Sequence, residues 1–214
     1  VPPMVVTAER DIAGAAVAAD KVVQTHRRLV EFLRPGQTLA QIDAFVGETL
    51  KDLGCRSAFL GYRVRGHPPF PSHACLSVNE CVVHGTHDMT TRPIERGDVL
   101  SIDIGVKSEG WIGDAAWTYG IVEVDDAAAS LMRCGRESLR RGLAAIRPGR
   151  PLIDWAKAVQ EYVERRCGYC LVDTGRKVQE QGTGTVLQCR HFRTGPPRYG
   201  SRSGRRRQDP SGRL

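Results

Sequence analysis

Two carboxylates flank the stretch DIGVKSEGWIGD, which runs from Asp103 to Asp114. The stretch is typical of a tight antiparallel hairpin. A two-residue loop at Ser108 and Glu109 would place the two aspartates directly opposite each other, with Cβ atoms about 4.5–5.5 Å apart. A bulge at Gly110 would instead shift the register by one residue and rotate one acid off the shared face.

Facing carboxylates need a shared proton or bound cations, because two ionised acids at this distance repel each other. Both acids lie in apolar strands, VLSIDIGV and WIGDAAW, where an unpaired buried carboxylate would be costly. Two solvent-facing acids in strands or turns are the alternative. Carboxylates with an imidazole suit Mn, Fe, Co or Zn better than they suit metals that prefer thiolates. The pattern therefore favours a site for divalent cations.

The elements that position this hairpin are predicted from residue spacing. A capping box at Thr38 and Gln41 marks the start of one helix. The turn RPG occurs twice, and each time a helix ending in glycine follows it, at 34–54 and at 147–168. This internal repeat predicts two pseudo-symmetric halves with a site between them. The expected helices are 7–33, 38–54, 126–146 and the segment from the second RPG turn to Gly168, and the expected strands are 74–83 and 99–122.

The positive charge of the chain is confined to its last fifth. The net charge of +7 over 214 residues arises from Asp173 to Leu214, where ten Lys and Arg residues accompany three acids. Apolar residues there are too sparse to offset an ordering entropy of about 1–2 kcal/mol per residue. We therefore expect a folded domain over 1–172 and a disordered basic tail over 173–214.

Composition narrows the class of protein. No apolar run approaches the roughly 20 residues needed to span a bilayer. The first residues, VPPMVVTAERD, do not resemble a secretory signal. Seven cysteines, an odd number at irregular spacing, argue against a disulfide framework. We expect a cytoplasmic protein with reduced thiols.

Two longer segments carry a family resemblance. PSHACLSVNECVVHGTHD and IERGDVLSIDIGVKSEGWIGDAAWTYGIV resemble the type I methionine aminopeptidases, and the resemblance covers residues 5–172. It implies the α+β pita-bread fold, with two pseudo-symmetric halves around a dinuclear metal site. It also implies metal-dependent removal of the N-terminal methionine from nascent proteins.

The resemblance assigns roles to particular residues. It makes Asp103 and Asp114 ligands of two divalent cations (Co, Mn, Fe or Zn), which activate a hydroxide and act as Lewis acids. His84 matches a catalytic histidine that contacts substrate near the scissile bond. The methionine pocket is lined by Tyr62, Phe70 and Cys75.

The neighbouring His87 and Asp88 match no functional position, so we interpret them as loop residues. The implied partners are the N-terminal methionine of nascent polypeptides and the ribosome. A monomer without membrane or nucleic-acid partners is expected.

The last part of the chain departs from the family pattern. The family needs a histidine in a GHGIG-like segment and two further glutamates. These positions fall near Val178, near Ser211 and beyond Leu214, and no GHG occurs there. We therefore expect an incomplete second half, impaired metal binding and an inactive chain. The abrupt change after Val172 leads to the hypothesis that the tail is translated in a shifted reading frame.

Two other functions start from the tail itself. Its Arg- and Gly-rich sequence, with Phe192 and Tyr199 available to stack on bases, would suit a non-catalytic fragment that binds nucleic acid. Alternatively, Cys167 and Cys170 with a pair further along the chain could form a zinc clip, or they could form a redox pair. The further zinc ligands would be Cys189 and His191.

Overall fold

The structure is a computed structural model that describes residues 8–169. It forms two compact units, whose described parts are 8–137 and 138–169. The first unit contains α1 (Glu9–Phe32), α2 (Leu39–Asp52), β1 (Arg56–Ser57), β2 (Cys75–Val78), β3 (Val99–Ser108), β4 (Trp111–Gly120) and the start of α3 (Asp126–Ala145). The second contains the rest of α3, α4 (Ile153–Gln160) and a π-helical segment, Glu161–Arg166.

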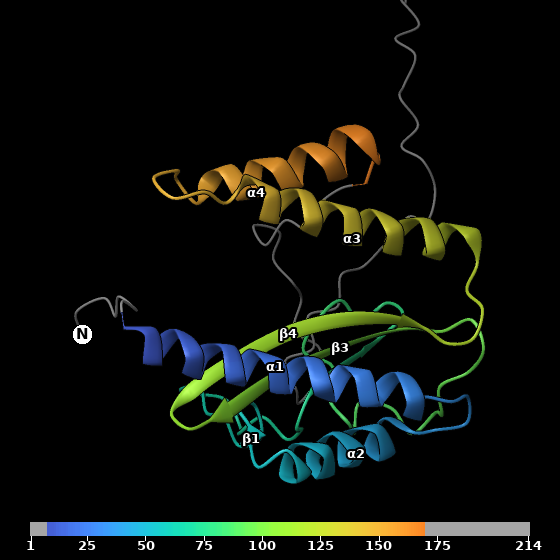
Figure 1. Ribbon diagram of the computed structural model, residues 1–214. Helices are drawn as coiled ribbons and strands as arrows, with labels where there is room; N and C mark the ends of the chain where they lie inside the picture. The colour runs from blue at the N-terminus through green and yellow to red at the C-terminus, as the bar shows by residue number, and fades with distance from the viewer. Residues whose placement is uncertain (1–7, 170–214) are drawn as a thin grey trace, which may run out of the picture. The chain divides into compact units, whose positions relative to one another are not determined.

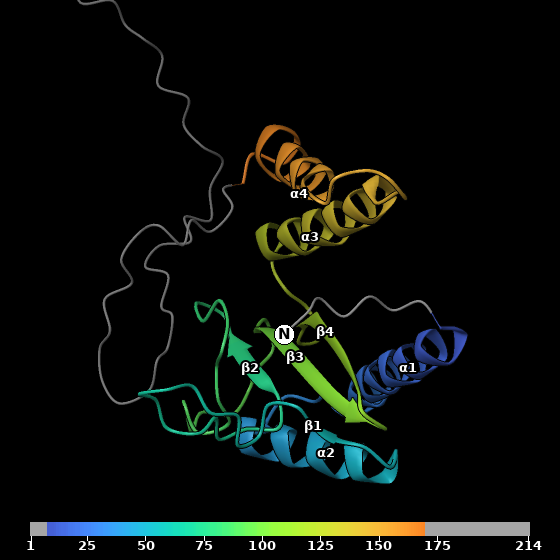
Figure 2. The same cartoon turned by 90° about the vertical axis from the view of Figure 1, so that its left-hand side faces the viewer.

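The sheet of the first unit is antiparallel and is organised around β3. Along one edge, β3 pairs with β2 and with the short β1; along the other it pairs with β4 over its full length. Helices α1 and α2 cover one face of this sheet (Figures 1 and 2). The helix pair followed by strands that the repeat predicts for the first half is therefore confirmed.

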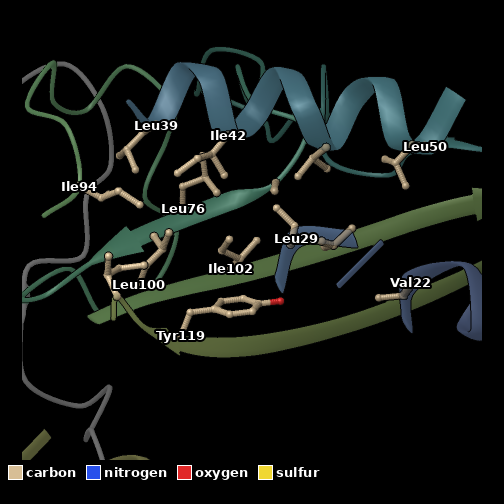
Figure 3. Close-up of a cluster of buried hydrophobic side chains, with 14 of the residues drawn as sticks. Val22, Leu29, Leu39, Ile42, Leu50, Leu76, Ile94, Leu100, Ile102 and Tyr119 are labelled. Carbon is tan, nitrogen blue, oxygen red and sulfur yellow. The ribbon is translucent and has the colours of Figure 1, made fainter. Parts of the chain in front are cut away.

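The core lies between the two helices and the sheet (Figure 3). Alternate residues of β3 point into it and are fully buried: Leu100, Ile102, Ile104 and Val106. Burying each such side chain stabilises the fold by about 1.5–3 kcal/mol. Because side chains alternate along a strand, Asp103 points to the opposite face of the sheet from these residues.

Local signals in the sequence account for most element boundaries. The Thr38–Gln41 capping box is present at the start of α2. Gly36 in the first RPG turn has a φ of +93°, which glycine tolerates best. The strand expected over 74–83 is shorter and ends at Val78, because the next residue, Asn79, adopts a φ of +50° and leaves the extended conformation.

The second unit, described by itself, is a pair of helices joined by the second RPG turn. Gly142 allows close packing, since a Cβ there would lie 2.7 Å from the Nε1 atom of Trp155. The Arg141 guanidinium lies 4.4 Å from the centre of the Tyr162 ring. The helix expected to end at Gly168 is present, with its last turns in π geometry. Among residues 8–169, no helix has both the length and the apolar content needed to cross a bilayer.

Candidate metal and substrate site

The β3–β4 hairpin differs in register from the prediction. Its two-residue turn is Glu109–Gly110, with φ values of +51° and +87°. Asp103 therefore pairs with Ala116, and Asp114 pairs with Gly105. The predicted direct opposition of the two aspartates is wrong. A type I′ turn needs left-handed backbone at both positions, so the turn lies where it includes a glycine.

The two aspartates nevertheless share one face of the sheet. Cross-strand partners lie on the same face, and Asp114 is two residues from Ala116, the partner of Asp103. The carboxylates are thus diagonal neighbours, close enough for a side-chain hydrogen bond between them. The bulge that would have separated them is not present in this hairpin.

The carboxylate pair is electrostatically unfavourable as it stands. Burial raises the pKa of Asp103, although a hydrogen bond from Asp114 and the charge of His84 oppose the rise. Burial also raises the pKa of Asp114, and the neighbouring charge of Asp103 adds to the effect. The Oδ1 atom of Asp103 is buried and has no hydrogen-bond partner among the described residues. These are the properties of a carboxylate pair that a cation would satisfy.

The loop that follows β2 brings His84 to this pair. Leu76 N–H donates to the carbonyl of Gly85 at 2.8 Å, and Gly85 N–H donates to Ser77 Oγ at 3.2 Å. A Cβ at Gly85 would lie only 2.1 Å from the Leu76 carbonyl oxygen, so this return requires glycine. His84 itself is exposed, with a φ of +59°.

Cys75 lies beside the carboxylates as the direct strand partner of Asp103. Burial raises the pKa of its thiol to about 12, with the charges of Asp103 and Asp114 contributing, while a hydrogen bond from the His84 backbone opposes the rise. The thiol is therefore neutral at physiological pH. It presents a soft, weakly polar surface next to the acids, which suits contact with a thioether.

Aromatic side chains lie next to the carboxylates' face of the sheet, near Gly105. Gly61 N–H donates to the Phe70 carbonyl at 2.8 Å, and Phe70 N–H donates to the Tyr62 carbonyl at 2.9 Å, so these residues close one loop. The rings of Phe59 and Phe70 meet edge to face, with centroids 6.3 Å apart. Sequence reasoning missed Phe59. The signal that could have pointed to Phe59 is the glycine at position 105, because a Cβ there would lie 2.5 Å from the Phe59 ring.

His87, which we interpreted as a loop residue, has a structural partner. Ser72 Oγ lies 2.9 Å from His87 Nδ1 and also accepts a hydrogen bond from the His87 backbone. Asp88 accepts a hydrogen bond from Thr86.

Two residues of the family-like motifs also have structural contacts that sequence reasoning did not identify. The Asn79 amide donates to Asp98 at 2.8 Å, and its carbonyl oxygen accepts from Val99 N–H at 2.9 Å. These contacts tie the end of β2 to the start of β3.

Metal ligation is incomplete within the described residues. Residues 8–169 contain no group of three or more His, Cys, Asp or Glu side chains arranged to hold a metal ion. The tail 173–214, and with it the positions expected for the further ligands, lies outside the described residues. Three of the four zinc-clip candidates, Cys170, Cys189 and His191, also lie outside them.

The comparison with known proteins assigns the chain to a family. The sequence profile of metallopeptidase family M24 matches residues 13–210. This chain belongs to metallopeptidase family M24. The matched range of this M24 chain continues past residue 172, where we expected the folded domain to end.

Individual relatives of the M24 chain are methionine aminopeptidases. It is 35% identical over 185 residues to methionine aminopeptidase 1 of Bacillus subtilis, covering 85% of this chain and 69% of that protein. It is 36% identical over 148 residues to methionine aminopeptidase 1 of Mycobacterium tuberculosis, covering 69% of this chain and 52% of that protein. The chain thus spans between about half and two thirds of these relatives.

Solved structures agree on the fold. The crystal structure of methionine aminopeptidase from Thermotoga maritima matches with a TM-score of 0.70 at 32% identity, over 77% of this chain and 64% of that one. Prolidase from Pyrococcus furiosus matches with a TM-score of 0.63 at 15% identity, over 75% of this chain and 44% of that one. The predicted α+β pita-bread fold of the M24 family is confirmed.

Proposed function

We propose that this chain carries the first half of a methionine aminopeptidase site. One observation supports this most directly. The buried Oδ1 atom of Asp103, which has no hydrogen-bond partner within residues 8–169, belongs to a carboxylate that neighbours Asp114 and is close enough to His84 to feel its charge. A carboxylate pair that is half-buried at Asp103 and has raised pKa values, with a nearby imidazole, matches the donor set that Mn, Fe, Co and Zn prefer.

The residues divide the work by chemistry. Asp103 and Asp114 would hold divalent cations, which when bound would supply Lewis-acid polarisation and activate a water molecule. His84 contacts the substrate beside the scissile bond. Tyr62, Phe70 and the neutral Cys75 enclose the methionine side chain.

The proposed substrate is the N-terminal methionine of nascent polypeptides. We propose that the chain acts on it in the cytoplasm, at the ribosome, as a monomer. Only two carboxylate ligands are provided by the described residues, so we propose that this chain binds cations weakly and does not turn over at ordinary aminopeptidase rates. A catalytic centre of this kind depends on the full ligand set to hold the metal in place.

Metal binding and turnover test this proposal separately. Titration of the full chain with Mn²⁺, followed by calorimetry, should show weak binding that Asp103→Asn and Asp114→Asn each remove. Incubation with Met-Ala-Ser peptide and added Mn²⁺ or Co²⁺ should release no methionine above background. Binding that both variants retain would refute the metal assignment, and turnover at ordinary rates would refute the claim of inactivity.

A further inference from the structure

The segment that contributes Tyr62, Phe70 and Cys75 to the proposed methionine pocket (the pocket wall) carries positive charge only. Residues 53–79 contain no Asp or Glu, and they include β1, the aromatic loop and β2. Three arginines lie in this segment: Arg56, Arg63 and Arg65. Asp52 precedes it and Glu80 follows it, so acids are absent over the whole length of the wall. A wall for an apolar methionine side chain does not by itself require this bias.

Two of these arginines lie on the loop closed by Tyr62 and Phe70. The residues from Gly61 to Pro68 are all exposed, Arg63 and Arg65 among them. Neither arginine forms an ion pair within the described part of the chain. Arg63 directly follows Tyr62, so its Cα lies about 3.8 Å from that of a pocket residue.

A second pair of cations lies on the same face of the sheet as the aspartates. Arg56 and Lys107 are direct cross-strand partners, and both are exposed. Like charges placed directly opposite destabilise a sheet, and an anion that contacts both would relieve the repulsion. Lys107 is four residues from Asp103 along β3, which places it about 13 Å away.

The face therefore has opposite charges at its two ends. Asp103 and Asp114 form a negative end, which suits a cation or a peptide ammonium group. Phe59 covers Gly105, and Arg56 and Lys107 lie beyond it along the strand. An extended peptide advances about 3.3–3.6 Å per residue, so a chain that starts at the aspartates reaches the cations within about its first five residues.

We propose that Arg63 and Arg65, together with Arg56 and Lys107, form a cationic rim that selects peptides with Asp or Glu shortly after the N-terminal methionine. This inference rests on the proposed function, because it needs a peptide whose N-terminus lies at the aspartates. The rim acts on substrate choice and does not take part in the chemistry.

Equilibrium binding to the full chain in EDTA tests the rim without turnover. The probes are fluorescent Met-Ala-Asp-Glu-Asp, the neutral Met-Ala-Ser-Gly-Ser, and the acidic peptide with an acetylated N-terminus. The acidic peptide should bind about 3–10-fold more tightly than the neutral one at 20 mM salt, and the preference should fall below about 2-fold at 0.5 M salt. Arg63→Gln/Arg65→Gln and Lys107→Gln should each reduce the preference and leave neutral-peptide binding unchanged.

A matched control for the double arginine variant removes the same number of charges elsewhere on the protein. Arg10→Gln/Arg27→Gln removes two exposed charges from α1, which packs on the opposite face of the sheet, and should preserve the preference. Lys107→Gln should not lower the melting temperature, since it relieves a repulsion.

Several outcomes would overturn the inference in distinguishable ways. Equal binding of acidic and neutral peptides, both weakened when the N-terminus is blocked, would leave the proposed function standing and remove the rim. If the acidic peptide binds equally well with a free and with an acetylated N-terminus, the charge effect is unrelated to the pocket. No binding of the acidic peptide at all would also contradict the rim. An RNA oligonucleotide that binds through Arg63 and Arg65, without any peptide preference, would assign the surface to nucleic acid instead.

Discussion

The aspartate pair lowers the stability of the metal-free protein at neutral pH. Burial raises the pKa of Asp103 and of Asp114 above the value each group has in the unfolded chain. The folded state therefore binds protons more readily than the unfolded state, and its stability falls as the pH rises through the folded pKa values. This pH dependence is expected of a cation site in the metal-free protein, because a bound cation would neutralise the carboxylates as protons do at lower pH.

Asp114→Asn should raise the melting temperature of the metal-free chain at pH 7, because the variant no longer carries the charge that repels Asp103. The same variant should lose the upward shift that Mn²⁺ gives the original protein, since a ligand that binds only the folded state stabilises it. Thermal unfolding with EDTA or Mn²⁺ between pH 5 and pH 8 measures both effects. Glu31→Gln, at an exposed position on α1, is the control and should change neither. A lower melting temperature for Asp114→Asn without metal would contradict the prediction.

Asp98 shows the opposite behaviour. Its burial acts to raise the pKa, but hydrogen bonds from Asn79, from the Glu95 backbone and from Arg92 outweigh burial and lower it. A carboxylate with a lowered pKa contributes stability that is present above its unfolded pKa, near 3.9, and is lost as the pH falls through its folded pKa.

Asp98→Asn should therefore destabilise the protein by about 1–3 kcal/mol at pH 7, because the new amide group would face hydrogen-bond donors. Chemical denaturation at pH 7 and at pH 3.5 measures the loss. The difference between variant and original protein should shrink at the lower pH. A difference of the same size at both pH values would show that the contribution is not that of the charged carboxylate.

At the scale of elements, the β3–β4 turn determines where the aspartates meet. Glu109 holds a φ of +51°, a conformation that costs an ordinary residue energy and that asparagine tolerates better. The turn is therefore strained at one position, although Gly110 fits the other.

Glu109→Asn should stabilise the protein by about 0.5–1 kcal/mol, through the turn conformation rather than through charge. Glu109→Ala removes the same charge without favouring the left-handed conformation, so it should give no gain. Urea unfolding of the three proteins separates the two causes. Equal stabilisation by both substitutions would assign the effect to charge.

The contact between Gly105 and Phe59 joins the sheet to the pocket wall. Gly105→Ala would force the Phe59 ring to move, since the new Cβ would lie 2.5 Å from it. Overpacking of this kind costs about 1–3 kcal/mol. We expect the variant to lose stability and to bind Met-Ala-Ser-Gly-Ser more weakly, as measured by unfolding and by fluorescence anisotropy. Adding Phe59→Leu should recover part of the stability but not the binding, and a lack of coupling between the two changes would argue against the contact.

At the scale of the whole molecule, the first described unit holds the carboxylate pair, the imidazole and the aromatic wall. The repeat of RPG turns predicts a second, pseudo-symmetric half, and its opening helix pair is present in α3 and α4. The hypothesis of a shifted reading frame concerns the residues of this half beyond Val172.

The coding DNA offers a direct test of that hypothesis. Across codons 165–185 and beyond, an alternative frame should encode a Gly-His-Gly segment followed by acidic residues. Sequencing the gene, and measuring the mass of the purified protein, would check this. An uninterrupted frame with no such segment in either alternative would refute the hypothesis and leave the basic tail as a genuine part of this protein.

Much of the fold could be predicted from local patterns. Capping at Thr38, the RPG turns and the helical spacing are signals carried by neighbouring residues, so they predict the helices to within a few positions. They do not predict where β2 ends, because Asn79 leaves the strand to bond with Asp98 and Val99, which lie about twenty residues further along. The part played by Phe59 was hidden for the same reason.

The sequence by itself determined that two aspartates share a hairpin, and its resemblance to a family predicts that His84 and an aromatic segment belong to the same site. Side chains alternate between the two faces along a strand. When the turn moves by one residue, the cross-strand pairing moves by two, so both aspartates stay on the same face of the sheet. Only the tertiary structure decided which residues oppose which, how far each acid is buried, and which ring lies over Gly105. Those depend on the turn conformation and on packing between distant segments, which local patterns do not encode.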